Sequence, residues 1–142
     1  MKTSSSKFNG CIYFTANALA RKTEKLAQGV WKKLDLPPSH AYLLLMVLEE
    51  PGLQPGFLSE HLQLQPSTVT RLIEKLEEKK LVVRTAEGKV TNVYPTPKAR
   101  ELWPKMKECV AEFGKLCGNL ASCEETQRLV ASMARMADKI DS

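Results

Sequence analysis

Residues Pro55 to Tyr94 read PGFLSEHLQLQPSTVTRLIEKLEEKKLVVRTAEGKVTNVY, and this stretch carries the clearest structural pattern of the chain. Four of its apolar residues fall at i, i+3, i+4 and i+7: Val69, Leu72, Ile73 and Leu76. This spacing puts four apolar side chains on one face of a helix, where we expect them to be buried. Pro66 suits the first helical position because the N–H group that proline lacks is not needed there. The pattern therefore predicts an amphipathic helix that begins at Pro66.

The opposite face of this helix is polar. It carries Ser67, Thr70, Arg71, Glu74 and Lys75. A helix that enters the major groove of DNA needs such a face, because arginine bonds guanine bidentately and hydroxyls bond bases or phosphates. Taken alone, the helix is better explained as an ordinary amphipathic helix with a solvated face. The interpretation therefore depends on the flanking residues.

The flanking residues predict a second helix and a β-hairpin. An apolar stripe precedes the amphipathic helix at Phe57, Leu58 and Leu62, and only residues 63–65 separate the two. That is the turn length of a helix-turn-helix. After the helix, residues 81–85 and 90–94 are rich in β-branched side chains and are joined through Glu87-Gly88, where glycine permits a tight turn. This order predicts a mostly α, winged helix-turn-helix with a short β-hairpin wing.

Positive charge gathers on the same stretch. From Pro66 to Arg100, eight lysines and arginines stand against four glutamates, which accounts for most of the net charge of +5. Two of these cations, Arg84 and Lys89, lie on the predicted wing, where they can reach a phosphate or the minor groove. Scattered charge would indicate solubility alone, whereas a clustered excess of cations favours a polyanionic partner.

Two segments resemble the MarR family of bacterial transcriptional regulators. They are LSEHLQLQPSTVTRLIEKLEEKKLVVR, from Leu58 to Arg84, and TPKARELW, from Thr96 to Trp103. The resemblance implies a homodimer that binds a pseudo-palindromic operator in double-stranded DNA, usually as a repressor released by a small molecule or by oxidation. Family wings usually carry an Asp-Arg pair near the tip, whereas this wing is shorter and has Glu87-Gly88-Lys89 there.

The chemistry of the helix and wing residues predicts their roles on DNA. Bases are expected to be read by Thr70 and Arg71, and Arg84 is expected to support the wing. Phosphates are expected to be held by Ser67, Thr68, Lys75 and Lys89. Since lysine is a less directional donor than arginine, Lys89 would be a weaker substitute for the wing arginine.

The chain is expected to form a single domain, 1–142, with the winged part at 39–95 and flanking N- and C-terminal dimerisation helices at 8–34 and 97–141. Asn9, Ser39, Thr96 and Ser122 are the expected helix caps. The last helix carries an apolar stripe of Leu129, Val130, Met133, Met136 and Ile140. The terminal stripes exceed what one small winged domain can cover, so we expect a twin subunit, with a monomer of self-packed helices as the alternative.

Cys11 is a candidate redox sensor. It falls in the first turn of the first predicted helix, where the helix dipole favours a thiolate. Its surroundings, GCIYFTANALA, resemble the organic-hydroperoxide regulators, a MarR subgroup. That resemblance implies Cys11 as the sensing cysteine and Cys117 as the nearest match for a resolving cysteine, with Cys109 and Cys123 as rivals. The alternative is an inert core cysteine, since cysteine is among the most buried residue types.

A small aromatic ligand is the rival trigger. The resemblance implies a cleft between the dimerisation helices and the winged part, and the candidate lining residues are Trp31, His40, Tyr42, Trp103 and Met106. Each of them is also explained as ordinary core. We expect no cofactor and no metal, because the four cysteines lack C-x-x-C spacing and the chain has only two histidines.

An enzyme is not expected, because the sequence has no Gly-rich phosphate loop and no supported catalytic triad or carboxylate pair. A winged-helix protein-interaction module remains the alternative to DNA binding, since fold alone does not give function. The N-terminal stretch has neither the apolar core of a signal peptide nor a membrane-spanning run, so we expect a cytoplasmic protein without membrane contact.

Overall fold

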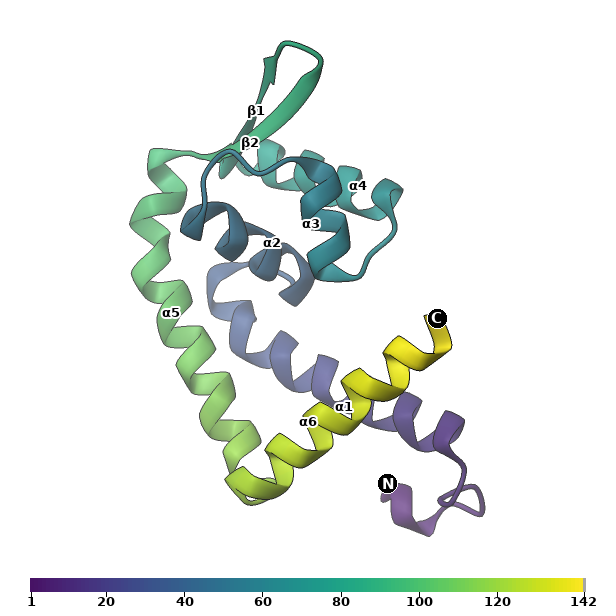
Figure 1. Cartoon of the computed structure of the whole chain (residues 1–142). Coiled ribbons are helices and arrows are strands. Elements are labelled where there is room, and N and C mark those ends of the chain that lie inside the picture. Colours follow the sequence, from purple (N-terminus) through teal and green to yellow (C-terminus); the bar gives the residue numbers. More distant parts are fainter. Residues whose placement is uncertain (142) are drawn as a thin grey trace. The chain divides into compact units, whose positions relative to one another are not determined.

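The computed structural model describes residues 1–141 and shows a mostly helical chain with one β-hairpin (Figure 1). Its elements are η1 (Thr3–Ser5), α1 (Ile12–Trp31), η2 (Lys32–Leu34), α2 (Pro38–Glu49), α3 (Pro55–Leu62), α4 (Pro66–Glu78), β1 (Val82–Glu87), β2 (Val90–Pro95), α5 (Pro97–Gly118) and α6 (Cys123–Asp141). They fall into two compact units, Met1–Cys109 and a second unit that begins at Val110, so α5 contributes to both. The predicted winged helix-turn-helix with flanking helices is confirmed.

Helix α2 lies at the centre of the first unit. It is apolar nearly all round, and its side chains Ala41, Leu43, Leu44, Val47 and Leu48 are buried. It contacts α1, α3, α4 and β2. The four predicted stripe residues of α4 are buried as well, and Pro66 occupies its first turn as expected. The amphipathic pattern of α4 therefore correctly predicted which side of the helix faces the core.

The wing is an antiparallel pair, and it projects from the helices of the first unit (Figure 1). Because Glu87 pairs with Val90, the two turn residues are Gly88 and Lys89, one position later than predicted. Gly88 has a φ of +66°, the positive value that the first turn position of a type II′ hairpin requires. Lys89 thus sits within the turn itself.

The base of the wing is joined to the loop between α2 and α3. The Gly52 N–H donates to the Val93 carbonyl at 2.8 Å, and the Val93 N–H donates to the Leu53 carbonyl at 2.9 Å. Gly52 has a φ of +93°, and a Cβ at this position would lie 3.3 Å from the Tyr94 ring. Glycine is needed at position 52 for both reasons. Leu53, which bridges to Val93, adds a third short segment to the wing, and this segment was not predicted from the sequence.

Two of the four predicted helix caps are wrong. Helix α1 begins at Ile12 with Cys11 as its N-cap, while the Asn9 side-chain amide donates to the Ser4 carbonyl instead. Helix α2 begins at Pro38, one residue before Ser39, because proline is favourable at the first helical position. Thr96 and Ser122 are confirmed, since each hydroxyl accepts a backbone N–H three residues later, at 3.2 and 3.1 Å.

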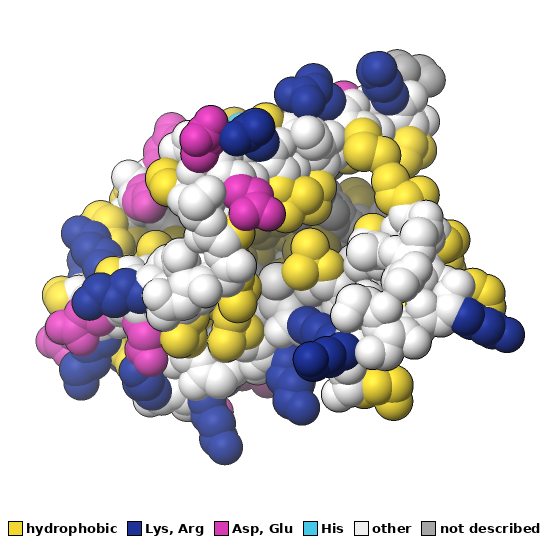
Figure 2. Space-filling view, turned by 90° about the horizontal axis from the view of Figure 1, so that it is seen from below, with side chains coloured by type: hydrophobic (Ala, Val, Ile, Leu, Met, Phe, Trp, Pro, Cys, Tyr) yellow, Lys and Arg dark blue, Asp and Glu magenta, His cyan; other side chains and the backbone are white. Residues whose placement is uncertain are grey.

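Large apolar side chains remain exposed on both terminal helices. Over Cys123–Asp141 no residue of α6 is buried, and the five stripe residues of α6 are 45% to 83% exposed. Ile12, Tyr13 and Leu19 of α1 are exposed too. Figure 2 shows hydrophobic side chains on one face of the molecule, together with basic and acidic ones. None of the helices within residues 1–141 is long and apolar enough to cross a membrane.

Two valines of the hairpin provide a matched test of this packing. Val93 is 0% exposed and Val83 is 48% exposed. We expect Val93→Ala to lower the free energy of unfolding by about 2 kcal/mol, because two buried methyl groups are lost and a cavity remains. Val83→Ala should change it by less than about 0.5 kcal/mol. Urea unfolding at one fixed protein concentration measures both, and equal losses would contradict this description of the core.

Candidate nucleic-acid interface

The outer face of α4 is polar and open. Ser67, Thr70, Arg71 and Lys75 are exposed, and Thr68 is half-buried. The Thr70 hydroxyl donates to the Pro66 carbonyl at 3.1 Å, and the Arg71 guanidinium donates to the Thr68 hydroxyl at 3.5 Å. A guanidinium has five N–H donors, so one long bond leaves most of its donor capacity for another molecule. Arg71 is therefore well placed to bind an acceptor outside the chain.

The turn before α4 is held by a buried hydroxyl. The Ser59 side chain donates to the Leu64 carbonyl at 2.7 Å, and the Leu64 N–H donates to the Ser59 carbonyl at 3.1 Å. Gln63 takes a left-handed conformation with a φ of +55°. These contacts fix the angle between α3 and α4. Ser59 was not predicted as a site residue. A small polar residue on the apolar side of a short helix was the sequence feature that could have indicated its role.

Arg84 connects the wing to α4. Its guanidinium lies 2.7 Å from the Glu77 carboxylate, and both side chains are partly exposed. An ion pair this accessible to water contributes little to stability, but it fixes where the arginine lies. Arg84 is thus engaged within the chain, and its supporting role in the wing stays a prediction. Lys89 is exposed at the wing turn.

Tyr94 lies on the same face of the hairpin as Glu87 and donates to its carboxylate at 2.7 Å. This hydrogen bond, with a smaller contribution from desolvation, raises the pKa of Tyr94 above its ordinary value. The phenol therefore stays protonated and remains a donor at neutral pH. With Glu87 bonded to Tyr94, the strand that leads to the turn is braced along its length.

The C-terminal end of α4 is fixed by contacts from distant segments. Lys79 forms an ion pair with Asp35 at 3.6 Å and also donates to the Asp35 carbonyl. The Lys98 ammonium donates to the Lys79 carbonyl at 3.0 Å, and the Thr96 hydroxyl donates to the Lys80 carbonyl at 2.7 Å. Two of the cations counted in the positive cluster, Lys79 and Lys98, therefore hold the helix end in place.

Of the five candidate ligand-pocket residues, two are buried in the core, two are half-buried and Tyr42 is exposed. Trp31 and Met106 are fully buried, and the Trp31 ring meets Tyr42 edge-on at 6.3 Å between ring centroids. Trp103 is half-buried beneath the Lys107 ammonium. Burial lowers the pKa of His40, and the nearby positive charges of Lys79 and Lys75 lower it further, so His40 is neutral at pH 7. The structure joins Trp31 with Tyr42.

The four cysteines have different environments. Cys11 and Cys123 are exposed, Cys117 is half-buried, and Cys109 is buried with its thiol 3.9 Å from the Val30 carbonyl. The interpretation as an inert core cysteine is therefore wrong for Cys11 and fits Cys109. At the N-cap of α1, the Cys11 thiol is open to small oxidants.

A family model described as the MarR family matches residues 34–90, which include α2, α3, α4 and most of the wing. This segment of the chain is similar to the MarR family. The chain is 22% identical over 126 residues to an uncharacterized HTH-type transcriptional regulator, YybA, of Bacillus subtilis (strain 168), across 87% of this chain and 84% of YybA.

Two solved structures resemble more than nine tenths of the chain. The S. aureus MepR–DNA complex has a TM-score of 0.80 at 19% identity, covering 91% of this chain and 97% of that one. The transcriptional repressor CouR, bound to a 23-mer DNA duplex, has a TM-score of 0.83 at 17% identity, covering 96% and 98%. At these identities the similarity establishes the shared fold.

Proposed function

We propose that this protein is a sequence-specific DNA-binding transcriptional regulator that places the N-terminal half of α4 in the major groove. The observation that carries this proposal is the open polar face of α4, with Arg71 at its centre and the opposite face fixed in the core. The MepR and CouR structures, which share the fold, both contain DNA. That likeness supports the same partner here.

The residues of α4 and the wing would have different roles on DNA, according to their positions. Thr70 and Arg71 would read base edges, because arginine matches the acceptors of guanine and a hydroxyl can bond any base. Phosphates would be held by Ser67, Thr68, Lys75 and Lys89. Arg84 would act through its bond to Glu77, which sets the wing against α4. Lys89 at the turn would bring a point charge close to the backbone.

A protein-interaction module is the competing function. Such a module would present apolar or aromatic anchors at the centre of its contact face. The outer face of α4 instead carries hydroxyls and cations. We therefore favour nucleic acid as the partner of this face.

Replacing Arg71 should change the sequence preference of DNA binding, whereas replacing Lys75 should change the affinity for all DNA. We expect Arg71→Ala to cost about 1–3 kcal/mol on the DNA upstream of the protein's own gene, and to relax sequence preference. Lys75→Ala should weaken binding to all duplexes alike and reduce the salt slope by about one unit. Fluorescence anisotropy at several salt concentrations, with shuffled DNA as reference, measures both effects.

The matched control is Lys25→Ala, which removes an exposed cation from α1. It should leave the affinity for both duplexes unchanged. Equal losses on specific and shuffled DNA for Arg71→Ala would remove its base-reading role. Wild-type protein that binds both duplexes equally would place the interaction-module function ahead.

The operator-bound form would be a homodimer joined by the terminal helices. The exposed apolar faces of α6 and of the first half of α1 support this arrangement, since single-chain packing leaves them open to water. A two-fold dimer would place two α4 helices on a pseudo-palindromic operator, one DNA turn of about 34–36 Å apart.

A charge in the α6 stripe should separate the subunits. We expect Met133→Glu to shift the protein from a dimer towards the monomer mass of 15.9 kDa, because it would bury an unpaired carboxylate in the interface. Ala131→Glu places the same side chain on the opposite side of α6 and should leave the dimer intact. Sedimentation equilibrium measures both masses. A wild-type monomer at micromolar concentration would contradict the dimer.

Release from DNA would follow either oxidation of a thiol or binding of a small ligand. The exposure of Cys11 favours oxidation. The Cys11 thiolate would attack an organic hydroperoxide, giving a sulfenic acid on Cys11 and releasing the corresponding alcohol. The thiol of Cys117 of the partner subunit would then displace water from the sulfenic acid and form a disulfide. The rival trigger is a small aromatic ligand bound near Trp31 and Tyr42.

Cys11→Ser should make DNA binding resistant to peroxide. We expect cumene hydroperoxide to weaken DNA binding by the wild type at least tenfold, and to leave Cys11→Ser unaffected. Cys123→Ser is the matched control, since Cys123 is also exposed, and it should respond like the wild type. Anisotropy before and after peroxide, with thiol counting, follows the reaction. A wild type indifferent to peroxide would turn attention to the aromatic ligand.

A further inference from the structure

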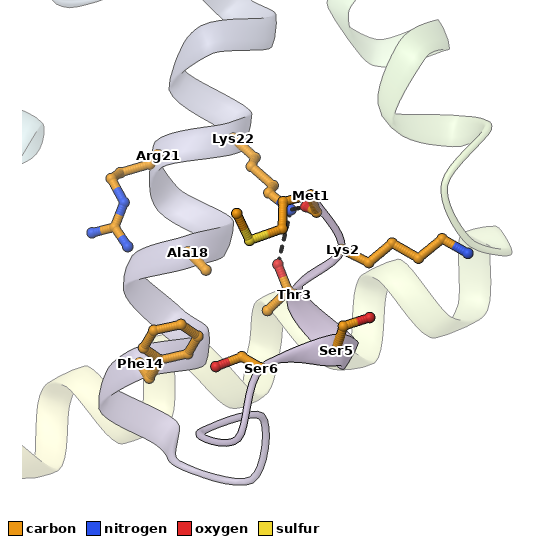
Figure 3. Close-up of a pocket in the computed structure, with 9 residues that line it drawn as sticks. All are labelled: Met1, Lys2, Thr3, Ser5, Ser6, Phe14, Ala18, Arg21 and Lys22. Carbon is orange, nitrogen blue, oxygen red and sulfur yellow. Dashed lines mark hydrogen bonds between the residues drawn. The ribbon is translucent and has the colours of Figure 1, made fainter.

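A cavity of about 330 Å³ lies between the N-terminal segment and the first half of α1 (Figure 3). Residues from both sides line it: Met1, Lys2, Thr3, Ser5, Ser6, Phe14, Ala18, Arg21 and Lys22. Its volume is within the range of small-molecule sites, which begins at about 300 Å³. All nine residues belong to the first compact unit. None of them is assigned to DNA binding, to the dimer or to the thiol chemistry.

The cavity is lined by both positively charged and apolar side chains. Three of the nine lining residues are Lys or Arg, three carry hydroxyls, and none is acidic. Met1, Phe14 and Ala18 supply the apolar surface. An anion in this cavity would meet no repelling carboxylate among its neighbours. A hydrocarbon attached to that anion would have apolar atoms to contact.

The three cations have different roles. The Lys22 ammonium donates to the Met1 carbonyl at 3.1 Å and to the Thr3 hydroxyl at 2.9 Å, so it ties the N-terminal segment to α1. Figure 3 shows Lys2 extending away from the other lining residues, and Arg21 on the same side of α1 as the Phe14 ring. Arg21 is thus the cation best placed beside an apolar wall.

The cavity and the proposed dimer face lie on different sides of α1. Phe14, Ala18 and Arg21 follow the i, i+4, i+7 spacing of one helical face. At 100° per residue, the exposed apolar residues Ile12 and Leu19 fall roughly 100–180° away from the three residues of that face. A partner subunit packed on Ile12 and Leu19 would therefore leave the cavity accessible.

We propose that this cavity binds a small amphipathic carboxylate. The carboxylate would lie against the Arg21 guanidinium, whose planar fork matches it bidentately, and the apolar body would lie against Phe14, Ala18 and the Met1 side chain. The apolar walls argue against an inorganic anion, which has nothing to place on them. A bound molecule would also hold the N-terminal segment against α1.

Isothermal titration calorimetry of the full chain with sodium octanoate tests the proposal. Octanoate should bind with one saturable site, and 1-octanol, which has the same apolar body without the charge, should bind at least tenfold more weakly. Arg21→Gln should weaken octanoate binding about tenfold, since a charge-assisted hydrogen bond is lost. Lys25→Gln removes a cation of α1 that does not line the cavity, and it should bind octanoate like the wild type.

Filling the cavity gives a second, independent test. Ala18 is 7% exposed, and Ala18→Leu should abolish octanoate binding by occupying the space. Thermal unfolding and DNA anisotropy would show that the variant is folded. Three outcomes would overturn the proposal: no octanoate binding at millimolar concentration, equal loss in Arg21→Gln and Lys25→Gln, or binding that persists in Ala18→Leu. Calorimetry does not involve DNA, so failure here is distinct from failure of the proposed function.

Discussion

The burial of the α4 apolar stripe against the core sets the orientation of the whole winged part. Val69, Ile73 and Leu76 are essentially inaccessible to water, and α2 is one of the elements they face. Each fully buried side chain of this kind contributes about 1.5–3 kcal/mol, so rotating α4 out of register would be costly. Arg71 therefore has to point outward. The orientation of the candidate interface follows from hydrophobic packing rather than from any polar contact.

Positive charge in the winged part has two uses that composition does not distinguish. Arg71 and Lys89 are open to a partner, whereas Arg84 and Lys79 bond to Glu77 and Asp35 inside the chain. The engaged cations set the positions of the wing and of the end of α4. A charge count over this region thus overstates the number of groups available to DNA, and a salt slope would reflect the smaller number.

The proposed activities occupy separate surfaces. The DNA face belongs to α4 and the wing, the proposed dimer contacts to apolar faces of α1 and α6, and the carboxylate site to the opposite side of α1. This separation allows each to be altered by a substitution that leaves the others unchanged. Cys11, at the N-cap of α1, is next in sequence to the exposed Ile12 of the proposed dimer face. Oxidation of Cys11 would therefore be expected to disturb subunit contacts first.

The helix-turn-helix, its buried stripe and the existence of the wing could be predicted from local patterns, because periodicity, Pro66 and Gly88 act within a few residues. The polar face from which Arg71 projects could be predicted in the same way. The long-range contacts could not. The ion pair of Lys79 with Asp35 joins residues 44 positions apart, and the contact of Leu53 with Val93 depends on how a loop meets a hairpin. Such contacts arise from the packing of whole elements, and no local pattern specifies them.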